Sequence, residues 1–128
     1  MTFTLVNTKT SERFFNRNGN EIKNVQAGTI VTKEIVSDNY DFFLVSQYTN
    51  RGCSVPLHYK VVYSTSKLEE GILQQIVYSQ CFNYVNWTGS IKIPGILQYA
   101  KKSAKFNSEI LGGIMVENRE LKSKMYYI

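Results

Sequence analysis

The segment Asp41 to Gln47, with the sequence DFFLVSQ, is the part of the chain that most constrains its fold. Four consecutive apolar residues stand at its centre, whereas a strand with one solvated face would alternate apolar and polar side chains. Such a strand is typically buried on both faces, as in the sheets of α/β proteins. With 128 residues, the chain corresponds to one domain or to a piece of one.

The other apolar segments predict that strands come first and helices follow. Three further strands are expected, in segments 3–6, 28–35 and 59–63. A helix is expected to begin at Ser66, because Ser66 and Glu69 have the spacing of a capping box, and to continue to about Val85. A second helix is expected from Pro94, which suits a first helical position, to a stop at Gly112-Gly113. This order predicts an α/β fold with a mixed sheet of about four strands followed by two packed helices.

The second predicted helix separates its apolar and basic residues. They fall on two faces at spacings of three and four: Ile93, Leu97, Ala100 and Ala104 on one, and Gln98, Lys101, Lys102 and Lys105 on the other. Ammonium groups on one helical face can hold phosphates as point charges, without reading base sequence. The alternative is an ordinary solvated helix surface.

The charge distribution supports an anionic partner for this helix. The net charge is +5, and it is uneven: eight Lys and Arg accompany seven Asp and Glu before Lys92, against seven and three from Lys92 onward. Concentration of positive charge near the C-terminus favours phosphate or nucleic acid as the partner. The two cysteines have no metal-ligand spacing, and neither a signal peptide nor a membrane span is indicated, so we expect an intracellular, cytoplasmic or nuclear, protein.

Other candidate sites have simpler interpretations. His58 is the only histidine, but no nucleophile motif or metal-ligand partner accompanies it, and a structural role is expected. Asp38 and Asp41 bracket a turn, where such residues cap backbone groups, so a metal site is not predicted there.

A further pattern runs through separated segments of the chain. In order they are Arg13-Phe14-Phe15, Gly28-Thr29-Ile30-Val31, Tyr40 to Gln47, Pro56 with His58-Tyr59, Asn83 to Gly89, Ile93-Pro94 with Gln98 to Lys102, and Tyr126-Tyr127-Ile128. Together they resemble the C-terminal part of the Piwi domain in the Piwi branch of the Argonaute family. Asn86 stands where Argonaute-branch members often carry a phosphate-contacting Arg, which favours the Piwi branch.

The resemblance implies an incomplete RNase H-like fold, in which residues 1–128 form the C-terminal portion of one Piwi domain. In that family a slicer tetrad of two Asp, one Glu and a fourth residue, usually His, holds two Mg²⁺ ions for phosphodiester hydrolysis. The fourth position corresponds to Lys101, and the three acidic positions lie upstream of the matching region. The terminal carboxylate of Ile128 is expected beside a metal ion that bridges to the 5′ phosphate of a guide RNA.

The function implied is binding of a small guide RNA, such as a piRNA, in RNA silencing directed at an RNA target. The residues expected to contact RNA are Tyr84, Gln98, Lys101, Lys102 and Lys105. No slicing is expected from this chain alone. One alternative is an RNase H-like endoribonuclease whose acidic metal ligands come from a missing upstream segment. That upstream segment of the MID and Piwi domains is also expected as a possible partner of this chain. Another alternative is a degenerate fragment that binds nothing specifically.

Overall fold

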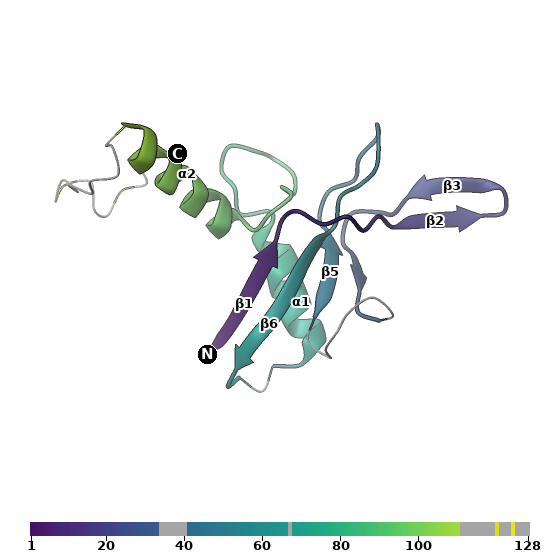
Figure 1. Cartoon of the computed structure of the whole chain (residues 1–128), viewed down its shortest axis with the longest axis horizontal. Coiled ribbons are helices and arrows are strands. Elements are labelled where there is room, and N and C mark those ends of the chain that lie inside the picture. The colour runs from purple at the N-terminus through teal and green to yellow at the C-terminus, as the bar shows by residue number, and fades with distance from the viewer. Residues whose placement is uncertain (34–40, 67, 111–119, 121–123, 125–128) are drawn as a thin grey trace.

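The computed structural model describes residues 1–33, 41–66, 68–110, 120 and 124 (Figure 1). The elements, in chain order, are β1 (Thr2–Asn7), β2 (Phe15–Asn18), β3 (Glu21–Asn24), β4 (Thr29–Val31), β5 (Phe42–Val45), β6 (Leu57–Ser64), α1 (Glu70–Gln80) and α2 (Gly95–Ile110). The α/β class and the order of strands before helices are therefore confirmed. Among the described residues, neither helix is long and apolar enough to cross a membrane.

The apolar segment after residue 40 forms β5, an interior strand of a four-stranded sheet. The sheet order is β1-β6-β5-β4, and all four residues of β5 are buried, as predicted. The three pairings in this sheet are antiparallel, which differs from the mixed sheet expected. Among the described residues, the neighbouring strands β4, β5 and β6 follow one another with no helix between them, and direct connections of this kind produce antiparallel pairs.

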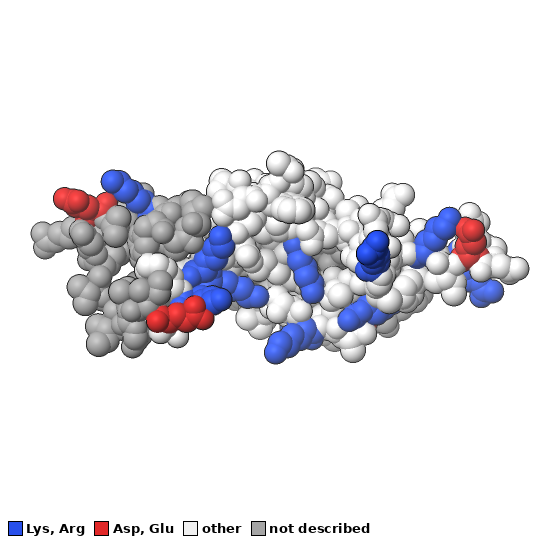
Figure 2. Space-filling model, turned by 90° about the horizontal axis from the view of Figure 1, so that it is seen from above, with Lys and Arg blue, Asp and Glu red and all other residues white. Residues whose placement is uncertain are grey.

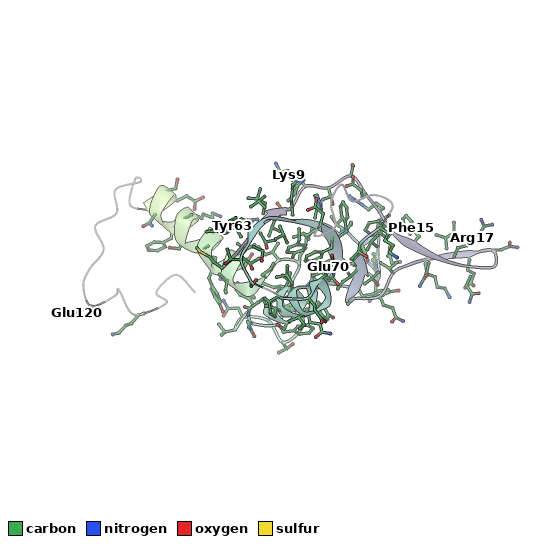
Figure 3. All side chains as sticks on the ribbon, turned by 90° about the horizontal axis from the view of Figure 1, so that it is seen from below. Lys9, Phe15, Arg17, Tyr63, Glu70 and Glu120 are labelled. Carbon is green, nitrogen blue, oxygen red and sulfur yellow. The ribbon has the colours of Figure 1, made fainter. Side chains whose placement is uncertain are left out.

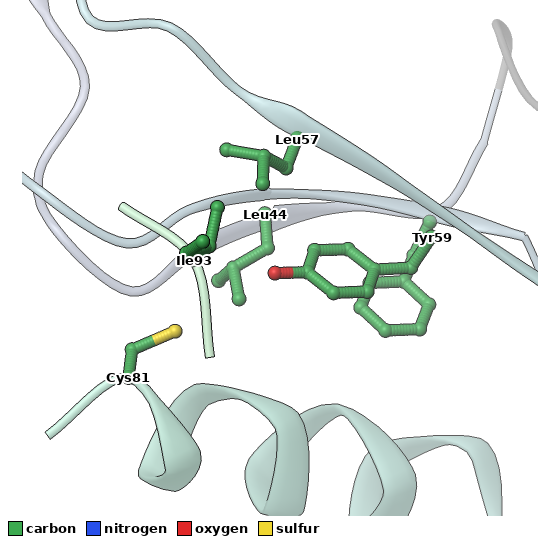
Figure 4. Packing of buried hydrophobic residues seen from close by; sticks show 6 residues of the cluster. Leu44, Leu57, Tyr59, Cys81 and Ile93 are labelled. Atoms are coloured by element: carbon green, nitrogen blue, oxygen red, sulfur yellow. The ribbon is translucent and has the colours of Figure 1, made fainter. Parts of the chain in front are cut away.

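The hydrophobic core lies between this sheet and α1. Pairing of Phe42 with Tyr59, and of Leu44 with Leu57, places these four side chains on one face, where their rings and branches meet Cys81 and Ile93 (Figure 4). The rings of Phe42 and Tyr59 stack with centroids 5.0 Å apart. Burial of one such side chain stabilises a fold by about 1.5–3 kcal/mol. Burial of Cys81 also raises the pKa of its thiol to about 11, so this thiol stays protonated at neutral pH.

The opposite face of the sheet is only partly covered. Phe43 is buried beneath the edge of Phe14 and stacks on His58, with ring centroids 5.7 Å and 4.5 Å apart. Towards β1 the same sheet becomes open, because β1 is an edge strand and its Phe3 and Leu5 are about half exposed or more. Buried and open regions therefore share one sheet.

The first helix differs from its predicted boundaries. It begins at Glu70, not Ser66, because the Ser66 hydroxyl bonds the hydroxyls of Thr2 and Ser64, at 2.6 Å and 3.0 Å, instead of capping the helix. It ends at Gln80 and does not reach Val85, because the chain turns at Cys81, whose N–H donates to the Tyr78 carbonyl.

The apolar side chains of this helix are only partly buried. Leu73 and Val77 pack against the core, whereas Ile72 and Ile76 are 43% and 44% exposed. The second helix, in contrast, begins beside Pro94 as predicted, with Ile93 buried and Leu97 packed on the core. The predicted stop at Gly112-Gly113 lies outside the described residues.

A hairpin formed by β2 and β3 was not predicted, because segment 16–20 has the composition of a polar turn. Its two strands pair from Phe15 with Asn24 to Asn18 with Glu21, and every residue except Asn24 is exposed. Gly19, at φ 62°, and Asn20 form the two-residue turn. The hairpin projects from the body of the molecule (Figure 1).

The contact between α2 and the turn after α1 predicts the effect of one small substitution. A Cβ atom at Gly95 would collide with the backbone carbonyl of Asn83. We expect Gly95→Ala to lower the free energy of unfolding by about 1–3 kcal/mol, measured by urea denaturation, because neither backbone can yield without moving α2. The control is Gly71→Ala in α1, where a Cβ meets nothing within 4 Å and should stabilise the helix by about 0.5–1 kcal/mol. Equal stability of the two variants would contradict this packing.

The open side of the sheet predicts self-association. The outer edge of β1 has no strand partner in the described chain, and exposed Phe3, Leu5 and Tyr63 lie beside it. We expect the 128-residue chain to sediment as concentration-dependent oligomers, and Leu5→Lys to reduce association because charge disfavours edge pairing. Leu68→Lys, at an exposed position before α1, is the control. A monomer at all concentrations would refute this expectation.

Candidate nucleic-acid interface

Helix α2 carries the basic residues singled out from the sequence, and its first turn is held firmly. Pro94 and Gly95 are buried, and the Gln98 N–H donates to the Pro94 carbonyl at 3.1 Å. Lys101 and Lys105 are exposed, whereas Gln98 and Lys102 are partly buried. The predicted separation of an apolar and a basic face holds only in part, because Ile93 is buried and Leu97 partly buried, whereas Ala100 and Ala104 of the predicted apolar face are exposed.

Two of these residues, Gln98 and Lys101, line a groove between α2 and the ends of two strands. We call this the basic groove and define it by Lys9, Lys92 and Lys101 together with Gln47 and Gln98. Its volume is about 500 Å³. Lys9 follows β1, Gln47 follows β5 and Lys92 precedes α2, so the groove gathers residues from four parts of the chain.

Hydrogen bonds hold the loop that carries Lys92 against the end of β5. The buried Ser46 hydroxyl donates to the Lys92 carbonyl at 2.8 Å, and the Ser90 hydroxyl donates in return to the Ser46 carbonyl at 2.7 Å. The Gln47 amide also donates to the Ser90 carbonyl, at 2.6 Å. Because these bonds fix the backbone on both sides of the groove, the groove is formed before any ligand arrives.

The charge of the basic groove is positive and uncompensated. Within the part of the chain that the structure describes, Lys9, Lys92 and Lys101 form no ion pair, and no acidic residue lines the groove. Three ammonium groups around one cavity raise the local concentration of anions. The two glutamine amides add hydrogen-bond donors, so the groove has the chemistry of a phosphate site.

The other two basic candidates have local partners and do not line the groove. The Lys102 ammonium lies 5.1 Å from the centroid of the Tyr84 ring, and its hydrogen bond to the hydroxyl is the largest of the causes that lower the pKa of Tyr84. Tyr84 also packs on Tyr99, with ring centroids 5.4 Å apart. Lys105 lies 3.8 Å from Glu109, one turn along α2.

Three residues of the basic groove were missed in the sequence: Lys9, Lys92 and Gln47. Each stands in a connection without a periodic pattern, so no single segment marks it. The increase in positive charge from Lys92 onward was the one available signal. Only the strand order shows that Lys9 and Gln47 approach the start of α2.

A separate polar cluster surrounds Asp41 on the face of the sheet away from α1. Its buried carboxylate lies 3.4 Å from His58 Nε2 and 4.0 Å from Lys60 Nζ. His58 is also stacked on Phe43, an arrangement that agrees with the structural role expected of it. Asp38 lies outside the described residues.

The described residues do not fit the Mg²⁺ implied by the resemblance. They include no group of three His, Cys, Asp or Glu side chains placed to hold a metal ion, and Lys101 contributes a positive charge. The Ile128 carboxylate, expected near a metal, lies outside the described residues. Residues outside the described part of the chain would therefore have to supply the missing ligands for Mg²⁺.

Comparison with known proteins identifies the family. The sequence model of the Piwi domain family matches residues 1–111 of this chain. Piwi-like protein 1 of Gallus gallus is 39% identical over 129 aligned residues, and Protein piwi of Drosophila melanogaster is 36% identical over 129; each alignment covers 100% of this chain and 15% of the relative.

Solved structures agree with the sequence comparison. The crystal structure of Drosophila Piwi superposes with a TM-score of 0.84 at 34% identity, over 99% of this chain and 17% of that one. Kluyveromyces polysporus Argonaute, solved with a guide RNA, gives a TM-score of 0.78 at 25% identity, over 99% and 18%. This chain thus spans less than a fifth of the length of these relatives, and it belongs to the family of proteins with a Piwi domain.

Proposed function

We propose that this chain binds the sugar-phosphate backbone of a small guide RNA, as the C-terminal part of a Piwi-type domain in RNA-guided silencing. The observation that carries the proposal is the basic groove, where three lysines without ion-pair partners among the described residues line one cavity. Family membership supports the same class of partner, since a similar Argonaute was solved with a guide RNA. An RNA target and a cytoplasmic or nuclear location belong to this proposal.

The groove supports contact with phosphates more than recognition of bases. Lysine ammonium groups act as point charges, and contacts of this kind fix the position of a nucleic acid without reading its sequence. Gln47, whose amide is held by its bond to the Ser90 carbonyl, and Gln98, which lines the same groove, can donate to phosphate or ribose oxygens. Lys102 and Tyr84 are proposed as a neighbouring contact, because the aromatic ring and the ammonium are already held together.

A slicer remains the second candidate, and it depends on residues outside this chain. Lys101 is proposed to occupy the fourth tetrad position, where it would contact a phosphate and would not ligate a metal ion. Acidic ligands for two Mg²⁺ ions would come from the upstream Piwi segment. The carboxylate of Ile128 is likewise proposed to reach the guide's 5′ phosphate through Mg²⁺, in a protein that includes the MID region.

RNA binding should depend weakly on salt and change measurably when one groove lysine is removed. For single-stranded RNA, log K falls with log[salt] at a slope of about −0.7 per neutralised phosphate. We expect Lys9→Ala, Lys92→Ala or Lys101→Ala each to make the slope shallower by about that amount in anisotropy titrations. Lys33→Ala, an exposed lysine outside the groove, is the control. Binding that is unchanged in all three groove variants would refute the proposal.

The chain alone is expected not to cleave RNA. Two-metal hydrolysis needs carboxylates that hold the ions roughly 3.5–4 Å apart, and the described residues have no such cluster. The measurement is incubation of the purified chain with a guide-paired, labelled target in Mg²⁺. Cleavage that requires Mg²⁺ and disappears in Lys101→Ala would contradict this expectation and support the second candidate.

A further inference from the structure

A second groove lies where the projecting hairpin joins the body of the molecule. We call it the hairpin groove; its volume is about 440 Å³. Six of its lining residues matter here: Asn16, Arg17, Asn18, Lys23, Gln26 and Tyr48. No aliphatic residue of the described chain lines it, and the proposed function does not use it. Figure 3 shows Phe15 and Arg17 on the hairpin, at the opposite end of the molecule from α2.

The two walls of the hairpin groove are tied together by one side chain. The amide nitrogen of Asn24, at the end of β3, donates to the carbonyls of Thr49 and Gly52, both at 2.8 Å. Its amide oxygen accepts a bond from the Ser54 N–H at 3.0 Å. Because these bonds join the hairpin to the loop that carries Tyr48, the groove has a fixed shape, which lowers the entropy cost of binding.

The groove combines an aromatic ring, two cations and several amides. Tyr48 is 53% exposed although it is held in a groove wall. The Arg17 Nε–H donates to the Gly19 carbonyl at 3.2 Å, which orients the guanidinium. Lys23 lies 2.7 Å from Glu21, but both side chains are exposed, and an exposed pair of this kind is weak enough for a phosphate to compete.

This combination matches one class of ligand better than others. Single-stranded nucleic acids are held by aromatic rings on which bases stack and by cations that follow the backbone. Amide side chains can both donate to and accept from base edges, which have both kinds of group. Among the residues that the structure describes, no carboxylate lines the groove, and the nearby Glu21 is already paired with Lys23, so the lining offers little counter-charge to a basic peptide.

The hairpin groove is also placed to continue a strand held in the basic groove. Gln47 lines the basic groove, and the next residue, Tyr48, lines the hairpin groove. Among the residues coloured in Figure 2, Lys and Arg are distributed along one face from the α2 end to the hairpin end, and Asp and Glu lie towards the two ends, with one acidic patch directly beside the basic patch on the α2 side. Between these two ends, a phosphate backbone could follow this face without meeting an acidic cluster among the coloured residues.

We propose that the hairpin groove binds a nucleotide of single-stranded RNA, with the base stacked on Tyr48 and phosphates at Arg17 and Lys23. The inference rests on the proposed function, because it extends the path of the same RNA beyond the basic groove. The hairpin groove differs from the basic groove in its chemistry, because stacking on an aromatic ring contributes to binding there in addition to charge.

The test measures the affinity of the full 128-residue chain for a labelled oligouridine of about ten nucleotides by fluorescence anisotropy. We expect Tyr48→Ala to weaken binding about tenfold, because loss of one base–aromatic stack commonly costs 5- to 100-fold. Tyr48→Phe should bind like the unmodified chain, because it keeps the ring. Tyr63→Ala, at a residue that is also 53% exposed but lies on β6, should have no effect. Circular dichroism of each variant checks that the fold is retained.

The outcomes separate this inference from the proposed function. If the groove lysines matter but Tyr48→Ala binds normally, or if Tyr48→Ala and Tyr63→Ala weaken binding equally, the hairpin inference is wrong and the basic groove stands. If Tyr48→Ala weakens binding while Lys9→Ala, Lys92→Ala and Lys101→Ala do not, the basic groove fails and the hairpin groove stands. If the chain binds no RNA, or if the hairpin groove binds only a peptide, the inference is overturned.

Discussion

The exchange of hydrogen bonds between Ser46 and the segment from Ser90 to Lys92 connects the hydrophobic core to the basic groove. Ser46 directly follows the buried strand β5, so its position is fixed by the packing of Phe42 and Leu44. Through Ser46, that packing also fixes the backbone of Lys92 and the entry to α2. Without these bonds, neither the connection that carries Lys92 nor the start of α2, which carries Lys101, would be held against the end of β5, and the positive charges would not be concentrated at one cavity.

The sequence predicted elements best where burial determines them. The segment from Asp41 to Gln47 was correctly predicted as a buried strand, because a short run of four consecutive apolar residues is typical of a strand that is covered on both faces. The predicted start of α1 at Ser66 was wrong, because a capping-box spacing is only a local signal. The Ser66 hydroxyl instead forms a hydrogen bond with Thr2, 64 residues away. Long-range hydrogen bonds of this kind override local propensity and cannot be found from spacing.

The candidate site was predicted only in the part that one helix supplies. Gln98 and Lys101 have a helical spacing that marks a common face, and the structure places both in the basic groove. Lys9 and Gln47 come from connections at the ends of strands, and they meet α2 only because the sheet order is β1-β6-β5-β4. The β2–β3 hairpin was missed for a related reason: its strands are almost wholly exposed, so neither an alternating pattern nor an apolar run marks them.

The charge of the basic groove also limits how a metal ion could enter this region. Three ammonium groups around one cavity repel a divalent cation, and a ligand set of carboxylates is not present among the described residues. A phosphate bound in the groove would cancel part of this repulsion and supply oxygen ligands of the kind that Mg²⁺ prefers. Binding of an RNA backbone is therefore expected to precede metal binding at this face. In a longer protein, upstream carboxylates would then complete the ligand set around an ion already attracted by the RNA.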